Sequence, residues 1–145
     1  MTTTAQPTPT TKPPKTQDLA TLTIKPPPFA YAHLTATTTS PDPDETSMSL
    51  DPLDALQVRA YCNSALRQFL GDTGAAIPVD ILSVQASDVW VRVPRTDLSG
   101  FSASLTAYSG LAQGGGTTTV LRLRACGDWL GSLLGRVEQQ ELWAS

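Results

Sequence analysis

The stretch that most constrains the fold of this chain is residues 76–95, where two short runs rich in Val and Ile flank a polar break. In the second run, three alternate valines starting at Val89 share one side, and Trp90 and Arg92 share the other. A period of two residues is typical of a β-strand that buries a single face. The stretch therefore predicts a β-hairpin with one face in the core and the other toward water or a partner.

The length and composition of the chain fit one small domain with an N-terminal extension. The chain has 145 residues, of which 40% are hydrophobic and 16% are charged. Its first 28 residues hold seven prolines and nine threonines, so they bury too little apolar surface to offset the entropy of ordering. We expect a disordered Thr/Pro-rich tail over residues 1–28 and a single domain over residues 29–145, with a short apolar segment at 128–135.

The distribution of charge narrows the class of partner. The formal net charge is −3, and all three lysines precede Phe29, so the remainder carries seven arginines against twelve acidic residues. This balance argues against a dominant basic surface for RNA but allows a local one. The apolar stretches are far shorter than the ~20 residues that span a bilayer, and no secretory signal begins the chain. We therefore expect no membrane partner and a location inside the cell.

Two cysteines, Cys62 and Cys126, are expected to be free thiols. Cys62 falls within a predicted helix and Cys126 at the end of a predicted strand, far away in the sequence. Such positions fit buried small hydrophobic side chains of an intracellular protein better than a disulfide framework.

Two helices are predicted between the strands. Asp51 and Pro52 suit the start of an amphipathic helix that runs to Leu70, with Gly71 as its stop. A second helix is predicted over residues 96–108, where apolar residues recur at three- and four-residue steps. The first helix is apolar along one side only, so we expect it to lie on a sheet.

Strands over residues 29–39 and 120–126 are predicted from alternating side chains and complete the order of elements. Strand, helix, strand, strand, helix, strand is the ferredoxin-like order shared with RNA-recognition (RRM-like) domains. We predict an α+β sandwich, in which a four-stranded antiparallel sheet carries both helices on one face. Residues 40–48 and 110–119 are expected to be plain loops, since they lack the spacing of a calcium loop and the Gly-Lys-Ser/Thr ending of a phosphate loop.

The helix-free face of this sheet is the predicted binding surface. Aromatic and arginine side chains on an open sheet can stack on RNA, or anchor a protein interface. The alternative that these are ordinary outward residues, partly covered by the termini, stays open. The candidate RNA- or partner-binding residues are Tyr31, His33, Trp90, Arg92, Arg122 and Arg124, with Trp129 added from the apolar segment that follows.

No catalytic residue, metal site or cofactor is predicted. His33 is the only histidine, which excludes a histidine-rich metal site, and we expect it to be a satisfied structural side chain. The Gly-x-Ser-x-Gly context of a nucleophilic serine is absent. The acidic residues at 42–45 share a loop without the apolar surroundings that would raise the pKa of one of them.

Three segments resemble a known family. They are residues 68–82, which include the pattern Leu-Gly-x-x-Gly-Ala-x-Ile-Pro-x-Asp-Ile-Leu, residues 89–95 (VWVRVPR) and residues 128–131 (DWLG). The chain resembles, over about residues 29–143, the fungal protein subunit shared by ribonuclease P and ribonuclease MRP, the Pop-eight-like domain. That domain is related to the Pop-five and Rpp-fourteen type subunits, which have a similar α/β sandwich.

The resemblance implies a non-catalytic subunit of a nuclear, nucleolar ribonucleoprotein whose RNA carries out the chemistry. The substrates are precursor transfer RNA for ribonuclease P and precursor ribosomal RNA for ribonuclease MRP. It further implies pairing with a Pop-five-type subunit and assembly with other ribonuclease P/MRP proteins around the RNA, and leaves direct RNA contact open. Two other functions remain as alternatives: a free-standing RRM-like RNA-binding domain and a small ferredoxin-like enzyme.

Overall fold

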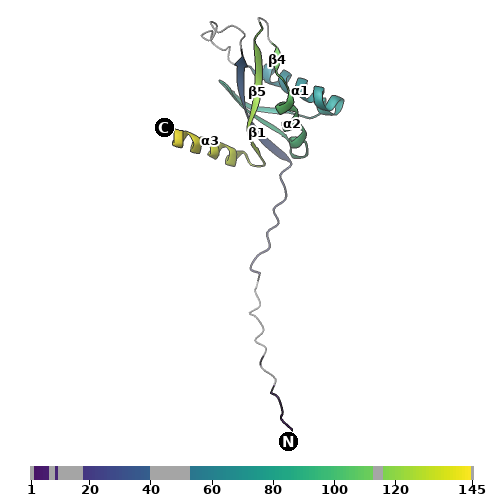
Figure 1. Cartoon of the computed structure of the whole chain (residues 1–145), viewed down its shortest axis with the longest axis vertical. Helices are drawn as coiled ribbons and strands as arrows, with labels where there is room; N and C mark the ends of the chain where they lie inside the picture. The colour runs from purple at the N-terminus through teal and green to yellow at the C-terminus, as the bar shows by residue number, and fades with distance from the viewer. Residues whose placement is uncertain (1, 7–8, 10–17, 40–52, 113–115, 145) are drawn as a thin grey trace.

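A computed structural model of the chain describes residues 2–6, 9, 18–39, 53–112 and 116–144 (Figure 1). Its elements are β1 (Phe29–Thr39), α1 (Ala55–Ala75), β2 (Asp80–Gln85), β3 (Asp88–Pro94), the 3-10 turn η2 (Arg95–Asp97), α2 (Leu98–Ala107), β4 (Leu111–Ala112), β5 (Thr118–Gly127) and α3 (Leu130–Ala144). Residues 40–52, which include the acidic loop and the predicted cap Asp51, lie outside the described residues.

The strands form one sheet in the order β2-β3-β1-β5-β4, and each neighbouring pair is antiparallel. The four long strands follow the predicted ferredoxin-like order, with β1 in the middle. The prediction of four strands was wrong, because residues 111–112 form a fifth strand that pairs with the start of β5. Gly110, with a φ of 115°, turns the chain into this pairing in a backbone conformation that side chains disfavour.

The core lies between the sheet and the helices α1 and α2, which cover the same face (Figure 1). The valine side of the hairpin faces this core, as predicted: Val89, Val91 and Val93 are fully buried. Full burial of one such side chain contributes about 1.5–3 kcal/mol. The other large buried contributors are Leu34 from β1, Val58, Tyr61 and Leu66 from α1, Phe101 and Leu105 from α2, and Leu121 from β5.

Two glycines shape the end of α1, and they explain part of the pattern at residues 70–82. Gly71 has a φ of 64°, which breaks the helix at the predicted place, and one further turn continues to Ala75. At Gly74 an added Cβ would lie 2.6 Å from Cβ of Leu70 and closer still to the carbonyl oxygen of Leu66. Both positions therefore require glycine, Gly71 because its φ is positive and Gly74 because a side chain has no space.

A β-bulge changes the alternation of β5. Leu123 pairs with Leu34, whereas Ala125 pairs with His33, so Arg124 is the extra residue between the two pairs. The prediction that Ala125 faces the core was wrong, since the bulge places it opposite an outward residue of β1. Cys126 now pairs with the core residue Ala32.

Helix α3 is longer than predicted and lies apart from α1 and α2. The expected short segment at 128–135 and a loose C-terminus are replaced by a helix that continues to Ala144. Leu133 is buried, and a Cβ on Gly127 would lie 3.8 Å from its Cδ2 atom. Because Gly127 pairs with the outward residue Tyr31, the first turn of α3 lies on the outward side of the sheet.

Among the described helices, none has the length and apolarity to cross a membrane.

The close approach at Gly74 gives a stability prediction. Gly74→Ala should lower the free energy of unfolding by about 2 kcal/mol or more, because the methyl group has no space. Gly135→Ala is the matched control: nothing lies within 4 Å of its Cβ position, and alanine favours a helix by about 0.5–1 kcal/mol. Urea unfolding of both variants measures the difference, and equal stability of the two would contradict the packing at Gly74.

Candidate interaction face

The outward face of the sheet brings four of the predicted residues together. In the ladder between β1 and β3, Tyr31 lies opposite Arg92 and His33 lies opposite Trp90. Residues directly opposite each other in an antiparallel pair point to the same side, so these four form one patch. We call Tyr31, His33, Trp90 and Arg92 the interaction face.

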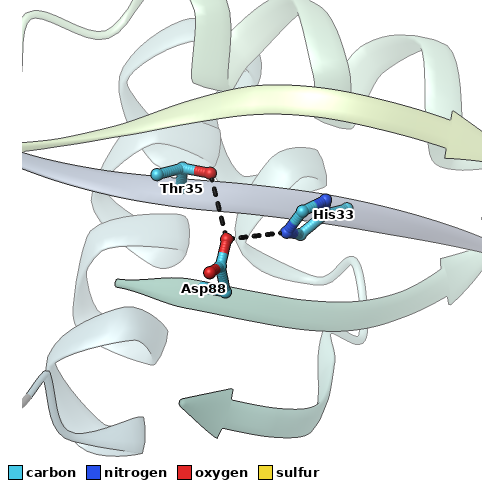
Figure 2. Close-up of polar contacts among 3 residues, drawn as sticks. All are labelled: His33, Thr35 and Asp88. Atoms are coloured by element: carbon cyan, nitrogen blue, oxygen red, sulfur yellow. Dashed lines mark hydrogen bonds and ion pairs between the residues drawn. The ribbon is translucent and has the colours of Figure 1, made fainter. Parts of the chain in front are cut away.

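His33 is held by two contacts, one to Trp90 and one to Asp88. Its ring stacks on the indole of Trp90, with 4.2 Å between the centroids and 2° between the planes. Its Nε2 atom lies 2.8 Å from Oδ1 of Asp88, the oxygen that also accepts a hydrogen bond of 3.3 Å from the hydroxyl of Thr35 (Figure 2). An ionised carboxylate only accepts, so the imidazole donates through Nε2. His33 is only 7% exposed and therefore positions Trp90 rather than meeting a partner itself.

Arg92 is also held in place. Its Nε and Nη2 atoms donate to Oδ2 of Asp80 at 3.1 Å and 2.8 Å, and its guanidinium lies 4.5 Å from the centre of the Phe29 ring. Asp80 lies on the edge strand β2 and Phe29 at the start of β1. The charge of Arg92 is thus already paired, and its planar group is fixed over an aromatic ring.

The remaining candidates lie outside this patch. Arg122 is exposed and faces outward from β5, opposite Thr35. Arg124 is exposed as the extra residue of the bulge. Trp129 is 56% exposed and lies in the connection between the end of β5 and the start of α3.

The sequence interpretation missed the residues that fix the face. Asp88 stands two positions before Trp90 and shares its side of the strand, so the alternation alone could have included it. Asp80 and Phe29 required the register between strands, which no local pattern contains. Together these partners hold Trp90 and Arg92 in defined orientations, which lowers the entropy that binding would cost.

A separate depression of about 390 Å³ lies beside the start of α2 and includes Arg95. Its other lining residues are Thr96, Leu98, Ser99, Ser102, Cys126 and Asp128. Nε of Arg95 donates to Oδ1 of Asp128 at 3.0 Å, so this cation is already paired.

In the parts of the chain that the structure describes, no group of three or more His, Cys, Asp or Glu side chains could hold a metal.

The geometry defines a class of protein: an α+β domain with ferredoxin-like topology, whose outward sheet face carries aromatic and arginine side chains held in fixed orientations. The sequence model of the family described as "Ribonucleases P/MRP protein subunit Pop8" matches residues 28–108, more than half of the chain. The chain belongs to this Pop8 family, the Pop-eight-like group that its sequence resembles, and is a non-catalytic protein subunit of an RNA-based enzyme.

A solved structure has a similar fold. A chain of the yeast ribonuclease MRP structure, determined by cryo-electron microscopy, matches with a TM-score of 0.58 and 21% sequence identity. The match covers 77% of this chain and 92% of that chain. No curated protein sequence matches the chain.

The two cysteines occupy opposite environments, which corrects the expectation that both are buried. Both thiols are free, but Cys126 is exposed at the depression whereas Cys62 is fully buried in α1. Burial raises the pKa of the Cys62 thiol from its ordinary value of 9.0 to about 12. The neutral thiol of Cys62 therefore contributes its full stabilisation of the folded state below pH 9, and this contribution is lost as the pH rises toward 12.

This difference predicts selective alkylation. At pH 8 iodoacetamide should modify Cys126 of the folded protein at least about a hundredfold faster than Cys62, because the thiolate is the nucleophile and Cys62 is both neutral and covered. Peptide mass spectrometry over time measures both rates. Unfolding in urea should make the rates similar, and equal rates in the folded protein would contradict the burial of Cys62.

Proposed function

We propose that the chain is an assembly subunit of ribonuclease P and ribonuclease MRP, and that it pairs through its interaction face with a related Pop-five-type subunit. Membership of the Pop8 family supports assembly into these two particles. The arrangement of the interaction face supports a protein partner. By assembling with other proteins around the RNA, the subunit supports processing of precursor transfer RNA and precursor ribosomal RNA. The proposed location is the nucleus, in the nucleolus.

The observation that carries this proposal is the fixed pair of Trp90 and Arg92. Trp and Arg are the residues most often found at the energetic centre of protein interfaces. Here each is supported by neighbours, Trp90 by His33 and Arg92 by Asp80 and Phe29. A protein surface gains from such rigid side chains because less side-chain entropy is lost on binding.

The charges favour protein over RNA at this position. Asp80 and Asp88 lie beside the interaction face; Asp80 neutralises the charge of Arg92, and the carboxylate of Asp88 would oppose a phosphate backbone. Arg122 and Arg124 on β5 are exposed cations that could contact RNA, and within the described residues neither forms one of the ion pairs. RNA contact, if the assembled particle has it, is therefore proposed at β5 and not at Trp90.

Purification of the full chain tests the proposed function. A tagged wild-type chain, expressed in its own cells, should recover the RNA of ribonuclease P or MRP together with a second small α/β subunit. Sequencing of the bound RNA and mass spectrometry of the bound proteins identify them. Recovery of neither would reject the proposal, and tight binding of RNA by the isolated chain with a steep salt dependence would favour the RRM-like alternative.

Substitution on the interaction face tests the proposed surface. Trp90→Ala with Arg92→Ala should reduce the recovered partner subunit about tenfold or more, because both anchors are removed. The domain should remain folded, since the lost aromatic stack contributes only about 1 kcal/mol and the valine side of β3 is unchanged.

The matched control is Leu56→Ala with Arg59→Ala, which also removes one large apolar side chain and one arginine, both exposed on α1. Circular dichroism of each double variant checks the fold. Unchanged recovery with the Trp90 and Arg92 double variant would show that the partner binds elsewhere.

A further inference from the structure

Tyr61 places a hydroxyl group inside the core of the domain. The residue lies on α1 and is 2% exposed, and its ring meets that of Tyr108 edge-on, with 4.9 Å between the centroids and 89° between the planes. Its hydroxyl oxygen is buried, and among the described residues none forms a hydrogen bond with it. Burial of an unpaired hydroxyl is costly, so most such groups in folded proteins have a partner, which is often an ordered water.

A small cavity adjoins Tyr61 between α1 and the edge of the sheet. Its volume is about 10 Å³, which is about the room that one water molecule requires and is far too small for an organic ligand. The other residues that line it are the apolar Leu53, Val58, Leu111 and Leu121 and the polar Gln57 and Thr119.

The backbone of β5 supplies another polar group beside the hydroxyl. β4 pairs only with Thr118 and Thr119, so beyond this point no described strand pairs with that edge of β5. Burial raises the pKa of Tyr61 above its ordinary value of 10.0, and hydrogen bonding from the backbone of Leu121 opposes the rise. A neighbour lowers the pKa of a phenol by donating to the phenolate. The N–H of Leu121 therefore lies near the hydroxyl oxygen, although no direct hydrogen bond joins them.

The polar groups around the cavity distinguish it from one that stays dry. Cavities lined only by apolar side chains remain empty, whereas a buried water makes about two to four hydrogen bonds. Thr119 is 6% exposed and is two positions before Leu121, on the same core side of β5. The Tyr61 hydroxyl, the Leu121 amide and the Thr119 side chain are together enough partners for one water.

We propose that this cavity binds one ordered water molecule, which connects the hydroxyl of Tyr61 on α1 to the backbone of Leu121 on β5. The hydroxyl and the N–H each donate to the water oxygen, which has two lone pairs. Thr119 and Gln57 have side-chain oxygens that can accept the two protons of the water. The water holds α1 against the sheet whichever partner the domain binds, so this site does not rest on the proposed function.

Oxygen-17 relaxation dispersion of the full chain tests the site, because it counts buried waters that exchange slowly with the solvent. Wild type should show one long-lived water more than Tyr61→Phe, which retains the ring and removes the hydroxyl. Tyr108→Phe is the matched control: it removes a hydroxyl from the neighbouring ring, which does not line the cavity, and should leave the count unchanged. Equal counts for wild type and Tyr61→Phe overturn the proposal.

Urea unfolding of the same variants gives a second test, since a bound water and a dry cavity predict effects of opposite sign. With the water, Tyr61→Phe should raise the equilibrium constant of unfolding about fivefold, because the N–H of Leu121 loses its bridge. In a dry cavity, removal of an unpaired hydroxyl would lower this constant. Tyr108→Phe should change it by less than about twofold, because Tyr108 is only partly buried. A constant for Tyr61→Phe at or below that of wild type overturns the proposal, whatever the water count.

Discussion

The register of β1 against its two neighbours determines which side chains meet on the outward face of the sheet. β1 is paired along one edge with β3 and along the other with β5, and it contributes both to the core and to the outward face. Its pairing with β3 sets His33 against Trp90, although the two residues are far apart in the sequence. A slip by one residue would exchange the two faces and expose the apolar side chains that now bind α1 and α2.

The polar groups of the interaction face already have partners, and this suits a subunit whose particle relies on RNA for its chemistry. Arg92 and His33 each contact a carboxylate, so the face offers shape and fixed aromatic groups more than net positive charge. Exposed ion pairs add little to stability, which means that Asp80 contributes mainly orientation. The domain thereby combines an acidic overall balance with membership of an RNA-containing assembly.

The parts of this structure that local patterns determine could be predicted from the sequence. The valines of β3 define their buried side by simple alternation, and Gly71 ends the first stretch of α1 because it alone accepts the required backbone angles. The arrangement of the four long strands in the sheet could also be predicted, because the order of strands and helices along the chain is that of a ferredoxin-like fold. The bulge at Arg124 and the partners of Arg92 depend on contacts between distant segments, so no local pattern contained them. Helix α3 was underestimated because Gly135 suggested its end, although nothing lies within 4 Å of the position that a Cβ on Gly135 would take.

The bulge at Arg124 has a consequence for how chains of this fold can diverge. Up to Leu123 the odd-numbered residues of β5 are on the core side of the sheet, and from Ala125 onward the even-numbered residues are on that side. Loss of Arg124 would remove the bulge and leave residues 125–127 opposite the same residues of β1, on the same sides of the sheet. Related chains that are shorter by this one residue would therefore keep the same side chains beside His33 and Leu133, so the bulge absorbs a change in length without changing either surface.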